Sequence, residues 1–139
     1  MVEPSIEMKE AYQRKSGSFM VSSSILLENN RLEEAVSMAY YSMYYMVIAL
    51  FFRTGIKCEN HSAAAIILEE LYGIDNTPME RAKEERIDKQ YYVDILVTRE
   101  DVEELIDLAE DFNAEIMDFT ERLKIRDIDK LRSQFSGMI

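Results

Sequence analysis

The chain has 139 residues and a formal net charge of −11 at pH 7, with 47% hydrophobic and 31% charged residues. This length allows one domain with a single core, and this composition excludes a disordered chain. The excess of acidic residues argues against a general affinity for polyanions. A single cysteine, Cys58, excludes an intramolecular disulfide framework. Together with a polar N-terminus that is unlike a signal peptide, this cysteine usage predicts a cytoplasmic protein.

Helices are favoured throughout, because the chain has only four glycines and two prolines. A first helix is expected from Ser5 to Leu27, where apolar residues recur at helical spacing. Gly17 and the serines at 22–24 have weaker helix propensities, so a bend or a break is expected near them.

A second helix is expected to begin at Asn30, because Asn30 and Glu33 form a capping-box pattern. Gly55 is a natural stop for this helix, since glycine readily takes the left-handed conformation just after a helix C-terminus. A short third helix begins at residue 60 or 61.

The second half of the chain has two further helix starts. Thr77-Pro78-Met79-Glu80 combines an N-cap residue, a proline at the first helical position and a glutamate, and predicts a short helix to about Arg86. Thr98 with Asp101 predicts the start of a last long helix, whose apolar residues are spaced by three and four. The tail at 126–139 is either a further short helix or a loose end.

These elements predict an all-α protein, an antiparallel up-and-down bundle of four main helices with additional short helices. No segment alternates as a β-strand would. We expect one helical domain at 1–125 and a short C-terminal extension at 126–139.

The second helix contains the apolar stretch MAYYSMYYMVIALFF at 38–52. Fifteen residues are fewer than the ~18 that a membrane span needs, so a buried helix is the better interpretation and no membrane partner is expected. Its outward side, which Glu33 and Glu34 mark in the first turn, is aromatic and needs a cover. Either another element of the same chain covers it, such as the helix at 78–86 or the tail, or a second subunit does. We favour a homodimer whose interface contains Tyr41, Tyr44, Tyr45, Ile48 and Phe52.

The order of motifs resembles the HEPN family of small helical-bundle proteins. The run Ala39-Tyr40-Tyr41-Ser42-Met43-Tyr44 is similar to the family's A-Y-Y-x-M-[FY] segment. Gly55-Ile56 and His61-Ser62 fit a pattern that follows this run in the family. Glu85-Arg86 followed by Tyr91 resembles its R-x4-Y segment. The resemblance covers residues 19–120.

This resemblance implies a homodimer that pairs with a minimal nucleotidyltransferase, often as a toxin–antitoxin couple. Many catalytic relatives cleave RNA without a metal, using an arginine and a histidine that are separated by four to six residues. Arg86 has this spacing, but Tyr91 stands where the histidine would be, and a tyrosine with a pKa near 10 is a poor base. The resemblance therefore implies a non-catalytic or weakly catalytic protein that binds a partner protein or a nucleotide. The alternative is a metal-independent ribonuclease toxin with a degenerate site, in which Arg86 and Tyr91 are the catalytic candidates.

Four residues are candidates for ligand binding: Arg86, Tyr91, His61 and Arg53. Each also has a structural interpretation. His61 could hydrogen-bond locally at a helix start, Arg53 could bind the C-terminal carbonyls of its helix, and Arg86 could form a surface ion pair. No cofactor or metal site is expected, since Cys58 has no partner ligand at metal-binding spacing. The acidic residues at 100–118 form a solvated helix face.

Overall fold

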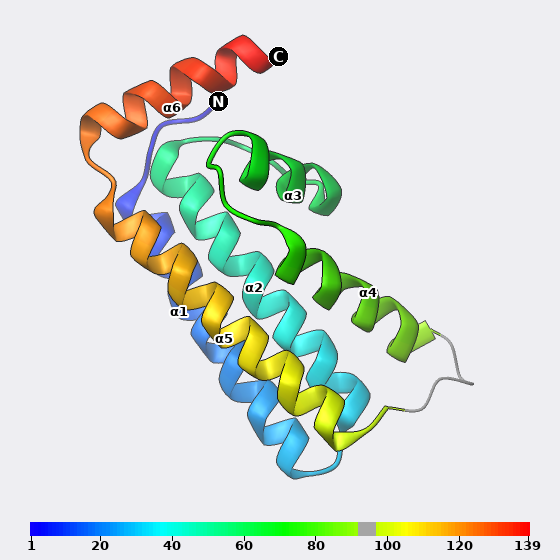
Figure 1. The fold of residues 1–139 in the computed structure, drawn as a ribbon. Helices are drawn as coiled ribbons and strands as arrows, with labels where there is room; N and C mark the ends of the chain where they lie inside the picture. Colours follow the sequence, from blue (N-terminus) through cyan, green and yellow to red (C-terminus); the bar gives the residue numbers. More distant parts are fainter. Residues whose placement is uncertain (92–96) are drawn as a thin grey trace.

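The computed structural model describes the backbone of residues 1–91 and 97–139, and the side chains of 1–86 and 97–139. The described part contains six α-helices and no strand (Figure 1), which confirms the predicted all-α class. The helices are α1 Ile6–Glu28, α2 Leu32–Thr54, α3 His61–Glu70, α4 Thr77–Tyr91, α5 Arg99–Arg122 and α6 Ile125–Met138.

Helix α2 is the centre of the fold, because it contacts each of the other five helices. This position explains why α2 is apolar on every side, since an enclosed helix has no face that remains in water. Among the described helices, α2 is long and apolar enough to cross a membrane by length and composition. However, 72% of its apolar window is buried inside the fold, as in the core helix of a soluble protein.

Helix α1 contacts α2 through a buried polar stripe that includes Ser16 and Ser23. The Ser16 hydroxyl donates to the Ser42 carbonyl (2.7 Å), and the Ser42 hydroxyl donates to the Ser16 carbonyl (2.8 Å). Ser23 donates in the same way to the Ala35 carbonyl (2.7 Å). The expected break near Gly17 is absent, because these side chains satisfy their hydrogen bonds across the helix pair while α1 stays continuous.

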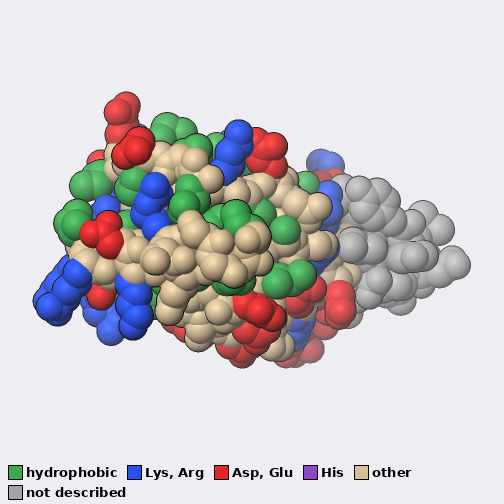
Figure 2. Space-filling view, turned by 90° about the horizontal axis from the view of Figure 1, so that it is seen from above, with side chains coloured by type: hydrophobic (Ala, Val, Ile, Leu, Met, Phe, Trp, Pro, Cys, Tyr) green, Lys and Arg blue, Asp and Glu red, His purple; other side chains and the backbone are tan. Residues whose placement is uncertain are grey.

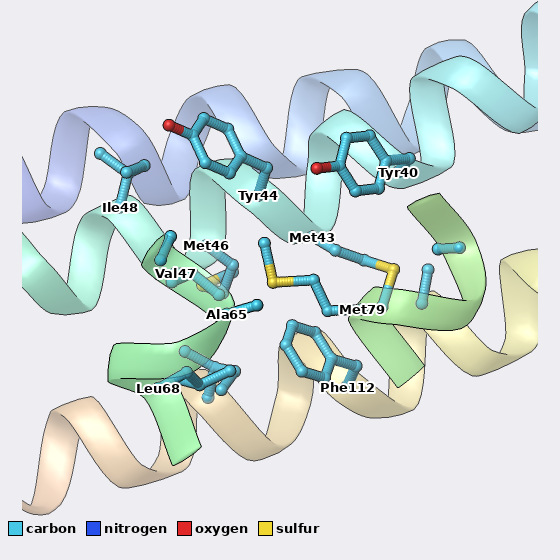
Figure 3. Close-up of a cluster of buried hydrophobic side chains, with 14 of the residues drawn as sticks. Tyr40, Met43, Tyr44, Met46, Val47, Ile48, Ala65, Leu68, Met79 and Phe112 are labelled. Carbon is cyan, nitrogen blue, oxygen red and sulfur yellow. The ribbon is translucent and has the colours of Figure 1, made fainter. Parts of the chain in front are cut away.

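The core on the other side of α2 combines aliphatic side chains with methionines and aromatic rings (Figure 3). Met43 of α2, Met79 of α4 and Phe112 of α5 are all at most 2% exposed. Flexible methionine side chains fill the irregular space among helices that cross at different angles. The apolar stripe predicted on the last long helix is the side of α5 that is buried in this core.

The helix starts follow the capping signals in part. Asn60 caps α3 by accepting from the Ala63 amide (3.0 Å), and Thr98 caps α5 by accepting from the Asp101 amide (3.1 Å). The expected capping box at Asn30 is wrong: Asn30 has a φ of 58°, and α2 begins after Arg31. Thr77 is a helical residue and not the cap, since its amide and hydroxyl both donate to the Asp75 carboxylate. Helix α4 also continues to Tyr91, beyond the expected end.

The C-terminal tail forms helix α6, which packs across the end of the bundle near the N-terminus (Figure 1). Ile128 and Phe135 are its buried residues. The Arg132 guanidinium donates to the carbonyls of Val2 (2.7 Å), Thr54 (3.1 Å) and Gly55 (3.2 Å). A cation is favourable here, because the last carbonyls of α2 carry partial negative charge. Figure 2, seen from this end, shows basic side chains gathered at one edge.

The aromatic side of α2 is covered by its own chain: α1 and α3 contribute, and Arg86 of the expected helix α4 lies over Tyr41. Tyr12 of α1 stacks on Phe52 (centroids 5.2 Å apart), and Phe19 of α1 meets Tyr45 edge to face (5.0 Å). Tyr44 and Ile48 are each only 9% exposed. Helices α1 and α3 thus provide much of the cover that we had assigned to a second subunit. The homodimer stays a prediction, with Tyr41, Tyr45 and Phe52 only half-buried in one chain.

Candidate functional site

His61 lies at the start of α3 with its ring packed against α2. Asn60 caps the first turn of α3. The next residue, His61, directs its side chain towards α2. The His61 ring stacks on Tyr44 with centroids 3.8 Å apart and an interplanar angle of 16°. The Tyr40 hydroxyl lies 2.7 Å from His61 Nδ1. Tyr40 and Tyr44 leave α2 on the side away from Phe112 (Figure 3).

Helix α4 adds two cations to this side of α2. The Arg86 guanidinium lies over the Tyr41 ring (5.0 Å from Cζ to the centroid) and near the Tyr40 ring (5.9 Å). Lys83 is on the same face of α4, three residues earlier, and its Nζ donates to the Ser62 hydroxyl (2.9 Å). We name this group the His61–Arg86 cluster; it consists of Tyr40, Tyr41, Tyr44, His61, Lys83 and Arg86.

The electrostatics of the cluster keep His61 neutral near pH 7. Burial is the main cause that lowers the pKa of His61, and the positive charges of Lys83 and Arg86 lower it further. Burial also raises the pKa of the Tyr40 hydroxyl, against the opposing effect of Arg86. Tyr40 therefore keeps its proton and can donate it to Nδ1, and the neutral imidazole then carries its proton on Nε2. Such a ring can donate a hydrogen bond to an anion.

The structure brings together two of the four predicted ligand-binding residues. His61 and Arg86 are 25 positions apart in sequence but contact the same tyrosine rings. Arg53 lies elsewhere, in the last turn of α2. Hydrogen bonds from Gln13 and Lys9 are the main causes that lower the pKa of Glu121, and the charge of Arg53 adds a smaller effect. The role we considered for Arg53, binding the last carbonyls of α2, is filled by Arg132. Tyr91 belongs to α4, but its side chain lies outside the described residues.

Sequence reasoning did not identify Lys83, Tyr40 and Tyr41 as ligand-binding residues; Tyr41 was predicted only at the dimer interface. Lys83 could have been found, because a spacing of three on a helix places it on the same face as Arg86. The two tyrosines could not have been found in this way, since in the sequence of a central helix they cannot be distinguished from core residues. Within the described side chains, no group of three or more His, Cys, Asp or Glu is placed to hold a metal ion.

The fold and this cluster define a small all-α protein with a cationic, tyrosine-lined site between α2, α3 and α4. The model of the HEPN domain matches residues 10–123, and the chain therefore belongs to the HEPN family. It is also similar to a UPF0332 protein of Thermotoga maritima, with 34% identity over 53 residues. That match covers 38% of this chain and 40% of the relative, so it spans well under half of either protein.

Proposed function

We propose that this HEPN protein binds the phosphate groups of a nucleotide or RNA at the His61–Arg86 cluster. The observation that carries the proposal is that Arg86, Lys83 and His61 converge on one site in a chain whose net charge is −11. A general polyanion-binding surface would need positive charge spread over the protein. A local site needs only a few cations in the right geometry.

The chemistry of the cluster suits phosphate attached to a base. A guanidinium binds phosphate oxygens through two parallel N–H donors, and an ammonium and a neutral imidazole N–H add further donors. Tyr41 is half-buried, so part of its ring can stack on a base, as aromatic side chains do in single-stranded RNA sites.

Binding of a fluorescein-labelled single-stranded RNA tests this function. Arg86→Gln should weaken binding by about tenfold, the usual effect of removing a charge-assisted phosphate contact. Arg81→Gln is the matched control: this arginine is on the same helix, half-exposed and paired with Glu104 (3.7 Å), so its loss should leave the affinity unchanged. Equal affinity of the Arg86→Gln protein and wild type, measured by fluorescence anisotropy at low salt, would refute the proposal.

We further propose the biological setting that family membership suggests: a cytoplasmic homodimer that acts as the non-catalytic or weakly catalytic partner of a minimal nucleotidyltransferase. Tyr41, a half-buried member of the cluster, would be part of the dimer interface, so that the two phosphate sites meet. The partner would bind the exposed acidic side of α5, which includes Glu103, Asp107 and Glu110. Association driven by such rim charges slows as salt is added.

The second candidate function is a metal-independent ribonuclease of a toxin–antitoxin pair. One observation favours it: the fold places a histidine beside Arg86 even though Tyr91 replaces the histidine of the R-x4-H spacing. Cleavage of RNA in EDTA by wild type, His61→Ala and Arg86→Ala separates the two functions. We expect no cleavage, or slow cleavage that His61→Ala leaves unchanged. Fast cleavage that both substitutions abolish would establish the ribonuclease instead.

A further inference from the structure

A cavity of about 590 Å³ lies between the N-terminal segment, α1, α2 and the loop that leads to α3. This volume is within the range of small-molecule sites. Phe51 (1% exposed) and Ile56 (2%) are the most buried residues of its lining, and Ile48 and Tyr44 are each 9% exposed. The cavity thus has a mainly apolar wall, made by residues that the fold already encloses.

The cavity is preformed, because hydrogen bonds hold its outer wall in place. The Val2 amide donates to the Gly55 carbonyl (2.9 Å), and the Ser5 amide donates to the Phe52 carbonyl (2.8 Å). Arg132 of α6 binds the Val2 carbonyl from the outside (2.7 Å). A site whose wall is fixed before binding loses little conformational entropy when a ligand enters.

The charged groups around the cavity have partners within the protein or lie in water. Lys57 Nζ is 3.5 Å from Glu59 Oε1, so these two side chains largely neutralise one another. The third charged residue of the lining, Glu3, is exposed to water. Lys15 Nζ lies over the Tyr45 ring (4.3 Å to the centroid) and already occupies its electronegative face. Neither a cation nor an anion would therefore find a partner here that repays the loss of its hydration.

One buried polar group is directed at the cavity, the hydroxyl of Tyr44. Figure 3 shows this hydroxyl pointing away from Phe112 in the core. Burial raises the pKa of Tyr44, and the four side chains that raise it further all line the cavity: Cys58, Tyr45, Tyr12 and Glu59. Among the residues that the structure describes, none is hydrogen-bonded to this hydroxyl. The protonated phenol can therefore donate a hydrogen bond to an acceptor inside the cavity.

The cavity and the phosphate site share Tyr44 but use different parts of it. The ring stacks on His61 with centroids 3.8 Å apart and so belongs to the His61–Arg86 cluster. The phosphate donors Lys83, Arg86 and His61 do not line the cavity. A ligand in the cavity would thus reach the cluster through this one phenol, and the His61 ring would sense its arrival.

We propose that this cavity binds an uncharged, mainly apolar small molecule that contains a carbonyl group. The wall around Phe51, Ile56 and Ile48 accepts the hydrocarbon part, and the Tyr44 hydroxyl donates to the carbonyl oxygen. A carbonyl suits a single donor, because it accepts a hydrogen bond without bringing a donor of its own that would stay unpaired. This inference goes beyond the proposed function and does not depend on phosphate binding.

Acetophenone is a suitable probe, and benzamidinium and benzoate are a cation and an anion of nearly the same shape. Methyl NMR of Met8 and Ile48, which line the cavity, reports binding at this place, and the His61 imidazole signals should move as well. We expect saturable shifts with acetophenone at millimolar concentration. Each charged molecule should bind at least about fivefold more weakly, because a buried charge without a partner costs free energy.

Tyr44→Phe tests the hydrogen bond, because it removes the hydroxyl and keeps the ring. It should weaken acetophenone binding about fivefold, the usual effect of losing one neutral hydrogen bond. Toluene is the matched control ligand, since it has the ring but no acceptor, and the variant should bind it no more weakly than wild type does. The proposal is overturned if acetophenone gives no saturable shift, if either charged molecule binds equally well, or if the variant weakens acetophenone no more than toluene.

Discussion

Gly55→Ala should lower the free energy of unfolding by about 3 kcal/mol, because it combines backbone strain with a steric clash. Gly55 has a φ of 75°, and a Cβ at this position would overlap the Val2 carbonyl oxygen and the Arg132 guanidinium. The substitution therefore forces apart the N-terminal segment, the end of α2 and α6. Urea unfolding followed by circular dichroism measures the loss.

Gly73→Ala separates the two causes. Gly73 has nearly the same backbone conformation, with a φ of 69°, but no atom lies within 4 Å of the added Cβ. This control should cost only about 1 kcal/mol, the price of the left-handed conformation alone. Equal losses for the two alanine variants would show that Arg132 and the N-terminal segment do not hold the end of α2.

Ser16→Leu should also destabilise the protein by about 3 kcal/mol, since it overpacks a close helix contact and removes a buried hydrogen bond. Ser16 is fully buried where α1 meets α2; its hydroxyl donates to the Ser42 carbonyl, and its own carbonyl accepts from the Ser42 hydroxyl. Ser16→Ala keeps the space and loses only the hydrogen bond, so it should cost about 1 kcal/mol.

Ser18→Leu is the matched control on the same helix, at an exposed position. It should change the free energy of unfolding by less than about 0.5 kcal/mol. If Ser16→Leu proved as mild as Ser18→Leu in urea unfolding, α1 would not be held against α2 by this serine contact.

The central place of α2 could be predicted from the sequence, because a helix that is apolar on every side must be enclosed. Which elements enclose it could not. Tyr12 and Phe19 are seven residues apart on α1 and look like part of an ordinary apolar stripe. The sequence gives no sign that they contact Tyr45 and Phe52 of α2. The serines at 22–24 were misjudged for a related reason: propensity treats Ser23 as a weak point of the helix, whereas its hydrogen bond to the Ala35 carbonyl makes it a contact with α2.

The candidate site was predictable only residue by residue. His61 and Arg86 each attracted attention, the first as the only histidine and the second through the family spacing. Their proximity depends on how α3 and α4 pack on α2, which no local pattern encodes. Local signals served better for caps, as at Asn60 and Thr98, because a cap depends on residues within one turn. Asn30 shows the limit, since the same residue type also suits a left-handed turn.

The most direct test of the phosphate site is the pKa of His61, measured by NMR with and without uridine 5′-monophosphate. His61 is the only histidine, so its imidazole signals need no assignment by mutagenesis. Burial, Lys83 and Arg86 hold this pKa below its ordinary value in the free protein. A bound phosphate places negative charge beside the ring and favours the imidazolium.

The account therefore predicts that the His61 pKa rises when the nucleotide binds. Because the pKa is then higher in the bound state than in the free state, affinity must increase as the pH falls through the interval between the two values. Arg86→Gln should raise the His61 pKa of the free protein, since it removes a nearby positive charge. In this variant, the further rise should need about tenfold more nucleotide, in line with its weaker binding. A His61 pKa that stays the same at saturating nucleotide would contradict a phosphate site at the His61–Arg86 cluster.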